Sequence, residues 1–299
     1  MINVVVRNDV VTNRVGRGFA SCLRALCLSL GALAVGVATA AVKPEGFPTD
    51  PSKVFLVLMI GQSNMAGRGV ITTENDTLNN RVFSLRKQYN YTTRRDDNYK
   101  WEVAKDPIHW DKAGVGVGPG RSFAEEYLKD HPDMYVCLVP VACGGTDIAE
   151  FMPGMQSRGT YSYPWDDAVV RIAAASMDGT WGAILFHQGE NDAASAEKAN
   201  AYEPRLFDLL ARTRAEIKGP NVPIIIGQIG TWSNQAYTSY PELIPVVTAA
   251  HQNATNAFTR CAFVPSTGLT HNNDIVHFDA ASQKEFGRRY YNAYKEVVK

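Results

Sequence analysis

Five continuous apolar runs, separated by stretches of helical pattern, constrain the fold of this chain more than any other feature. The runs cover residues 53–60, 134–141, 181–187, 222–229 and 260–264. They do not alternate apolar with polar residues, which is typical of strands that are covered on both faces of a parallel sheet. Helical patterns fall between and after the runs, at 120–130, 165–177, 194–217, 241–256 and 280–298. This alternation predicts βαβ units and a three-layer α/β/α sandwich.

A long polar stretch interrupts the rhythm between the first two runs. Residues 68–118 are rich in Asn, Arg, Tyr and Gly, and the stretch is too long for an ordinary connection. We therefore expect an irregular, functional insertion beside the site. The glycines at its end do not match the G-x-G-x-x-G pattern and follow no clear strand, so a dinucleotide site is not expected.

The first forty residues have the pattern of a signal peptide. Four arginines and a single aspartate lie within the first 24 residues, and an uncharged stretch follows from Ala25 to Ala41. It ends in Ala38-Thr39-Ala40, the small-x-small pattern that signal peptidase cleaves. The apolar run is short for a membrane span. We therefore expect residues 1–40 to be removed and the protein to be exported to the periplasm or the medium, with no membrane partner after cleavage.

Composition and cysteine content are those of a globular protein with at most one disulfide bond. We expect residues 41–299 to form a single domain. Of the 299 residues of the whole sequence, 45% are hydrophobic and 20% charged, as in ordinary globular proteins. Lys and Arg number 30 and so do Asp and Glu, so the charge does not favour nucleic acid as a partner. Cys137 and Cys143, about 20 Å apart if extended, are too distant for a disulfide. At most one bridge to Cys261 is possible, and three free thiols are the expectation.

Polar or glycine-rich segments follow four of the predicted strands. They cover 61–67, 142–147, 187–192 and 271–277. Ligands of open α/β sheets bind outside the carboxyl ends of the strands, so these segments are expected to meet at one site. Ser63 follows a buried strand in a glycine-flanked turn, where its hydroxyl can project while backbone N–H groups face an oxyanion.

A serine nucleophile needs a base, and the base needs an orienting carboxylate. Asp274 and His277 are three residues apart, so one turn can present both side chains to the same point. The structural alternative for Ser63 is a helix N-cap. The sequence Gly-Gln-Ser-Asn-Met at 61–65 lacks the second glycine of G-x-S-x-G, which weakens an assignment to the α/β-hydrolases.

Three segments in chain order resemble the signature of the sialate O-acetylesterase-like SGNH hydrolases, which include carbohydrate esterase family six. They read Gly-Gln-Ser-Asn-Met at 61–65, His-Gln-Gly-Glu at 187–190 and Asp-Ile-Val-His at 274–277. The resemblance spans residues 53–295. It implies a flavodoxin-like sandwich with a parallel sheet, the SGNH hydrolase fold. It also implies a serine esterase that removes acetyl groups from carbohydrate without a metal or other cofactor.

The resemblance assigns catalytic roles to individual residues. It implies that Ser63 is the nucleophile and that His277 is the general base. Two carboxylates compete for the role of helper acid, since the family pattern also gives that role to Glu190 in some members. Either carboxylate could hold the imidazole in the correct tautomer. The three-residue spacing to His277 favours Asp274.

The resemblance also implies an oxyanion hole with three donors. The first is the N–H of Ser63, and the second is a backbone N–H of the Gly144-Gly145 pair. The third is a side-chain amide, for which Gln188 is our choice. Asn191 is the rival, because residues 189–192 also match the G-x-N-D block of other SGNH enzymes.

Two other classes of protein are weighed against this interpretation. A metal-dependent hydrolase could use the cluster His271, Asp274, His277 and Asp279, but Ser63 and the glycine pair would then have no purpose. A non-catalytic carbohydrate-binding domain would need no nucleophile, base or acid. The candidate set of all three therefore favours an esterase.

The predicted substrate is an acetylated, neutral, xylan-type glycan. An acetyl group needs only a small slot, and the turns after the strands supply small residues, Gly67, Gly144, Gly145 and Thr146. No arginine pair adjoins the motifs to clamp a sugar carboxylate. Arg68 and Arg121 are the nearest exceptions in sequence. O-acetylated sialic acid is the alternative substrate.

Overall fold

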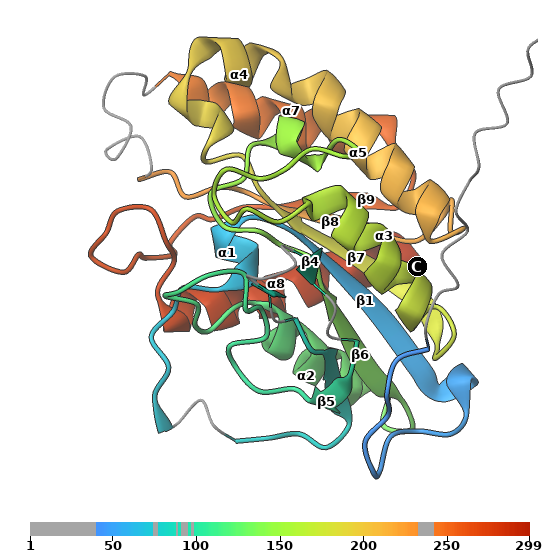
Figure 1. Cartoon of the computed structure of the whole chain (residues 1–299). Helices are drawn as coiled ribbons and strands as arrows, with labels where there is room; N and C mark the ends of the chain where they lie inside the picture. The colour runs from blue at the N-terminus through green and yellow to red at the C-terminus, as the bar shows by residue number, and fades with distance from the viewer. Residues whose placement is uncertain (1–39, 74–76, 88, 91–94, 97–98, 233–241) are drawn as a thin grey trace, which may run out of the picture. The chain divides into compact units, whose positions relative to one another are not determined.

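Seven strands form the main sheet of the protein, in the order β5-β2-β6-β1-β7-β8-β9, as a computed structural model shows (Figure 1). The structure describes residues 40–73, 77–87, 89–90, 95–96, 99–232 and 242–299. The strands are β1 Val54–Gly61, β2 Val82–Leu85, β5 Trp101–Val103, β6 Tyr135–Pro140, β7 Thr180–His187, β8 Ile224–Gly227 and β9 Cys261–Val264. All neighbours pair in parallel except β5, which pairs antiparallel with β2.

Helices cover both faces of this sheet. The longer ones are α2 Gly120–Asp130, α3 Pro164–Ala175, α5 Tyr202–Glu216, α7 Leu243–Ala257 and α8 Ala280–Val298. Side chains of β1 point alternately to the two faces. Leu58 and Ile60 pack in one buried cluster with α3, α5 and α7, whereas Val57 and Met59 pack in the other with α2 and α8. The predicted three-layer α/β/α sandwich is confirmed.

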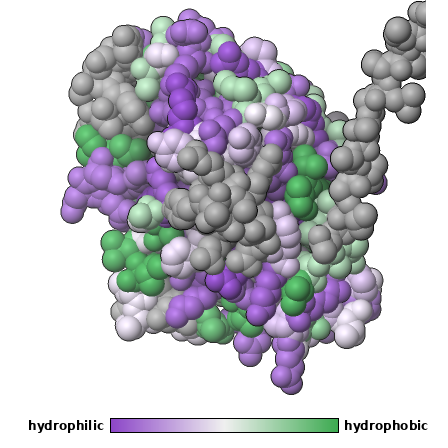
Figure 2. Space-filling view, in the orientation of Figure 1, coloured by the Kyte–Doolittle hydropathy of each residue, from purple (hydrophilic) through white to green (hydrophobic). Residues whose placement is uncertain are grey.

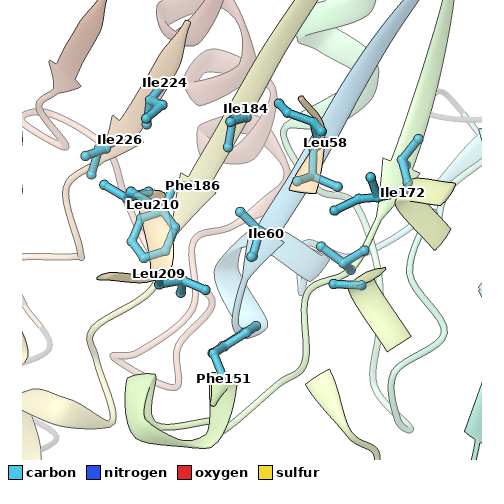
Figure 3. Close-up of a cluster of buried hydrophobic side chains, with 14 of the residues drawn as sticks. Leu58, Ile60, Phe151, Ile172, Ile184, Phe186, Leu209, Leu210, Ile224 and Ile226 are labelled. Atoms are coloured by element: carbon cyan, nitrogen blue, oxygen red, sulfur yellow. The ribbon is translucent and has the colours of Figure 1, made fainter. Parts of the chain in front are cut away.

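The larger of the two apolar clusters explains why the predicted strands read as uninterrupted apolar runs. Figure 3 shows its side chains from β1, β7 and β8 meeting those of α3 and α5. The labelled residues are Leu58, Ile60, Phe151, Ile172, Ile184, Phe186, Leu209, Leu210, Ile224 and Ile226. Because the opposite face of the same strands is covered too, no position along them needs to be polar.

The five predicted strands are all present, but two elements differ from the prediction. Residues 68–118 are not irregular throughout, because β2 and β5 extend the main sheet and β3 (Tyr89–Asn90) pairs with β4 (Arg95–Asp96). β3, β4 and β5 have only two or three residues, and Ser84 interrupts the four residues of β2, so none of them gives a continuous apolar run. The single helix predicted over 194–217 is divided at Ala201 into α4 (Ala196–Asn200) and α5.

The described residues answer some of the questions raised by the cysteines and the N-terminus. Cys137, Cys143 and Cys261 are buried free thiols, as predicted. The predicted signal peptide, residues 1–40, lies outside the described residues except for its last position. None of the helices that the structure describes is long and apolar enough to cross a membrane.

Candidate active site

Ser63 lies at the carboxyl edge of the sheet, where β1 passes into the short helix α1 (Ser63–Ala66). Its Oγ is 2.9 Å from Nε2 of His277. On the other side of the ring, Nδ1 of His277 is 2.6 Å from Oδ2 of Asp274. An imidazole protonated at Nδ1 donates to the carboxylate and leaves the Nε2 lone pair facing the serine hydroxyl. The structure thus brings these three predicted residues together in one hydrogen-bonded chain.

Asp274 also shapes the loop that carries the histidine. Its Oδ1 accepts hydrogen bonds from the backbone N–H groups of Val276, at 3.0 Å, and His277, at 2.8 Å. Partial burial opposes ionisation of Asp274, but these hydrogen bonds and the neighbouring imidazole hold its pKa below the ordinary value. The carboxylate is therefore ionised at neutral pH and can accept from the imidazole.

A glycine at the end of β1 lets the nucleophile turn out of the sheet. Gly61 has φ +148°, and a Cβ at this position would lie 2.0 Å from the carbonyl oxygen of His187 in β7. The N–H of Gln62 donates to the same carbonyl at 2.9 Å. The close approach of β1 and β7 thus requires glycine immediately before the turn that presents Ser63.

The predicted oxyanion-hole glycines differ in the availability of their N–H groups. The N–H of Gly144 donates to Oδ2 of Asp111 at 2.6 Å. No described residue accepts from the N–H of Gly145, which has φ +76°, or from the N–H of Ser63 at the start of α1. Of the glycine pair, only Gly145 thus has an N–H without an acceptor within the described chain.

Both candidate side-chain amides are already engaged. The Nε2 of buried Gln188 lies within hydrogen-bonding distance of three acceptors, Oδ2 of Asp192, the carbonyl oxygen of Thr146 and Oε1 of Gln62, which compete for its two hydrogens. The Nδ2 of Asn191 donates to the carbonyl of Gly145 at 3.1 Å and to Oδ1 of Asp147. Neither amide has a hydrogen left for an oxyanion in this arrangement, because each NH₂ group carries only two.

Glu190 is completely buried and is separated from the base. Its Oε1 accepts from Nδ2 of Asn64 at 2.5 Å and lies 3.5 Å from Nε2 of His187. Burial opposes its ionisation, but the His187 imidazole and the Asn64 amide hold its pKa below the ordinary value. Within the described structure its carboxylate has no hydrogen bond or ion pair with His277. The carboxylate in direct contact with the imidazole is that of Asp274.

The residues of the alternative metal cluster have other partners. Asp279 caps α8, accepting from the N–H of Ser282 at 2.8 Å, and its carboxylate also accepts from Thr270. The ring of His271 packs against Trp232, 5.4 Å between centroids. In the part of the chain that the structure describes, no three His, Cys, Asp or Glu side chains are placed to hold a metal ion.

Sequence reasoning missed two of the groups beside the glycine pair, Asp111 and Lys112. The guanidinium of Arg68 pairs with Asp111 at 2.9 Å, and both side chains are buried. Both would crowd a Cβ on Gly144, and Nζ of Lys112 would lie 3.5 Å from a Cβ on Gly145. The sequence offers no signal for Asp111 or Lys112, because both lie in the long polar stretch far from every motif.

Comparisons with known proteins identify the family of this chain. Residues 51–296 match the family described as carbohydrate esterase, sialic acid-specific acetylesterase. The chain is 30% identical over 266 residues to the probable carbohydrate esterase At4g34215 of Arabidopsis thaliana, a match that covers 84% of this chain and 94% of the relative.

Solved structures show the same fold. The Arabidopsis thaliana protein AT4G34215 superposes with a TM-score of 0.66 at 26% identity, covering 82% of this chain and 99% of the other. The crystal structure of NanS gives a TM-score of 0.63 at 15% identity, over 84% of this chain and 99% of the other. This chain belongs to the sialic acid-specific acetylesterase family of carbohydrate esterases and is a carboxylic ester hydrolase, a carbohydrate acetylesterase.

Proposed function

We propose that this carbohydrate esterase removes O-acetyl groups through a covalent acetyl-enzyme formed on Ser63. The observation that carries the proposal is the hydrogen-bonded chain from the Ser63 hydroxyl through His277 to Asp274. Ser63 Oγ attacks the acetyl carbonyl while Nε2 of His277 takes its proton. The imidazolium then gives this proton to the departing sugar oxygen as the C–O bond breaks.

Water completes the cycle. His277 Nε2 takes a proton from a water molecule, whose oxygen attacks the acetyl carbonyl on Ser63. The resulting tetrahedral intermediate collapses, acetate leaves, and the proton returns to Ser63 Oγ. In both halves the ionised Asp274 stabilises the imidazolium and keeps the proton on Nδ1.

The N–H groups of Ser63 and Gly145 are our proposed donors to the tetrahedral oxyanion. Both lack an acceptor within the described chain. The N–H of Gly144 is committed to Asp111, so we assign it to holding the turn. Gln188 and Asn191 are assigned to the same structural task, because their amide hydrogens are engaged.

A neutral, xylan-type acetylated glycan is our proposed substrate. Arg68 is paired with Asp111, and Arg121 with Asp106 at 3.3 Å, so a sugar carboxylate would have to displace an existing partner from either guanidinium. On the face shown in Figure 2, hydrophobic residues form small separate patches among hydrophilic ones. Such a surface suits a hydroxyl-rich ligand better than a lipid.

One observation favours O-acetylated sialic acid as a second candidate. The ammonium of Lys112 is placed near Gly145, and no ion pair joins it to any described residue. A single ammonium can attract a sugar carboxylate, although it lacks the bidentate geometry of a guanidinium.

Acetate release from a panel of acetylated glycans tests the proposed function. Wild type should release acetate from acetylated xylo-oligosaccharides, equally with and without a chelator, and Ser63→Ala should release none while keeping its melting temperature. Full activity of Ser63→Ala would refute the serine mechanism, and loss of wild-type activity in chelator would support a metal-dependent reaction instead.

Export is a separate part of the proposal. The arginine-rich start, the uncharged stretch and Ala38-Thr39-Ala40 support a cleaved signal peptide. N-terminal sequencing of the protein recovered from outside the cytoplasm should begin at Ala41. Recovery of a chain that still starts near Met1 would contradict cleavage after Ala40.

A further inference from the structure

Asn64 follows the proposed nucleophile directly and reaches across to the loop that carries the proposed base. It is 1% exposed. Its Nδ2 donates to the carbonyl of Val276 at 3.2 Å, and its Oδ1 accepts from the N–H of Phe278 at 3.0 Å. These two backbone groups lie on either side of His277. One side chain thus fixes the peptide groups before and after the histidine.

The second hydrogen of the same amide is held by Glu190. The contact from Asn64 Nδ2 to Glu190 Oε1 is 2.5 Å and wholly buried. An amide group can rotate, and its nitrogen and oxygen ends are nearly equal in size. A carboxylate can accept but cannot donate, so Glu190 requires the nitrogen end of Asn64 to face it, the same end that the Val276 carbonyl requires. The oxygen end is then left facing the N–H of Phe278.

The loop needs such a restraint because its backbone is strained. Ile275 has φ +53°, a left-handed conformation that is unfavourable for a β-branched residue and persists only where the surroundings enforce it. Asp274 holds the N–H groups of Val276 and His277 from one side. Asn64 holds the carbonyl of Val276 and the N–H of Phe278 from the protein interior.

We propose that Glu190 acts as a positioning residue through Asn64, which couples the backbone of the nucleophile to that of the base and sets the distance from Ser63 Oγ to His277 Nε2. This inference rests on the proposed serine mechanism. It differs from a helper acid, because Glu190 supplies a hydrogen-bond acceptor to Asn64 rather than a negative charge to the imidazole.

Two substitutions of Glu190 separate these roles. Glu190→Gln retains an acceptor oxygen for Asn64 but removes the charge, so kcat on a chromogenic acetate ester should stay within about threefold of wild type. Glu190→Ala removes the acceptor and should lower kcat by about tenfold or more, with KM nearly unchanged, since small misplacements of reacting groups cost this much. Equal losses for Gln and Ala would show that the charge matters and would overturn the proposal.

A double-mutant cycle tests whether Glu190 works through Asn64. Asn64→Ala should lower kcat by about a hundredfold. In that background, Glu190→Ala should change kcat by less than about twofold, because its target is gone. If the losses in kcat from the two single substitutions multiply in the double variant, Glu190 acts independently of Asn64.

A reciprocal exchange covers the case in which Asn64→Ala does not fold. Asn64→Asp places two carboxylates against each other and should be nearly inactive. Adding Glu190→Gln restores the contact between the two side chains with its direction reversed, but the new carboxylate still cannot donate to the Val276 carbonyl. The double variant should therefore recover only part of the loss, with kcat about tenfold above Asn64→Asp alone and still below wild type. No recovery, in a double variant with wild-type melting temperature, would contradict the proposal.

A matched control is Asp178→Asn. Asp178 is also a buried carboxylate with a hydrogen-bonded partner, since it accepts from Trp101 Nε1 at 2.7 Å. It lies just before β7 (Thr180–His187), at the opposite end of that strand from His187. Its replacement should lower the melting temperature without changing kcat. If wild type and Ser63→Ala have equal activity, or if both are inactive, the proposed function fails. If Ser63→Ala alone is inactive but the losses in kcat from Asn64→Ala and Glu190→Ala multiply, only the positioning role is refuted.

Discussion

Replacing Asp274 with asparagine should disable the base while leaving its loop in place. The new Oδ1 can still accept from the N–H groups of Val276 and His277, as the aspartate does. The new Nδ2 would stand where Oδ2 now lies, 2.6 Å from Nδ1 of His277. An amide NH₂ cannot accept a proton, so the ring would turn its lone pair toward it and carry its hydrogen on Nε2. That hydrogen would face Ser63 Oγ, and the ring could not take the serine proton.

The magnitude follows from the exposure of this carboxylate. In a serine protease with a buried aspartate the same change costs about 10⁴ in kcat. The Asp274 side chain is 45% exposed, so water can replace part of its stabilisation of the imidazolium. We therefore expect kcat to fall by about 10² to 10³, equivalent to about 3–4 kcal/mol.

The assay is kcat for a chromogenic acetate ester from neutral to mildly alkaline pH, with melting temperature measured in parallel. A matched control is Asp208→Asn, which removes an exposed carboxylate paired with Arg212 on α5 and should change neither quantity. The reasoning would be refuted if Asp274→Asn kept its melting temperature and retained kcat within about threefold of wild type. A larger loss from Glu190→Gln than from Asp274→Asn would transfer the helper role to Glu190.

Three further outcomes are expected. Acetate esters should be preferred over butyrate esters by at least about tenfold in kcat/KM, because Arg68 and Asp111 fill the space against Gly144; equal rates would show a larger acyl pocket. Neutral acetylated xylo-oligosaccharides should be preferred over 9-O-acetylated sialic acid in kcat/KM, and faster turnover of sialic acid that is lost in Lys112→Ala would reverse the assignment. Burial raises the pKa of Asp192 to about 7. Between about pH 4 and pH 7 the folded protein therefore keeps a proton on Asp192 that the unfolded chain has already released, so the free energy of unfolding should fall as the pH rises through this range. Asp192→Asn should lose less melting temperature between pH 5 and pH 8 than wild type, and equal losses would contradict the shift.

The sheet could be predicted from the sequence because its strands are covered on both faces. Each of the five predicted runs overlaps a strand of the main sheet, with boundaries that agree to within one or two residues. The prediction failed for the two strands at one edge of the sheet, β2 and β5. Strands β2 and β5 have four and three residues. β2 pairs with β6 and β5 pairs with β2, and neither strand lies in a long apolar run of its own.

The candidate site was predictable where function depends on local spacing. Asp274 and His277 meet because one turn joins them. Contacts between distant segments were not visible in the sequence. The bond from Gly144 to Asp111 and that from Asn64 to Glu190 join residues 33 and 126 positions apart, and no local pattern reports such a partner.

The acetyl-enzyme itself offers the most direct measurement. Wild-type protein turning over a chromogenic acetate ester is quenched in acid, digested, and mapped by mass spectrometry. We expect an acetyl group on the peptide that contains Ser63, at the Ser63 side chain, and none when Ser63→Ala is treated in the same way. Acetate release by wild type without Ser63 acetylation, at a rate that Ser63→Ala matches, would contradict a covalent serine mechanism.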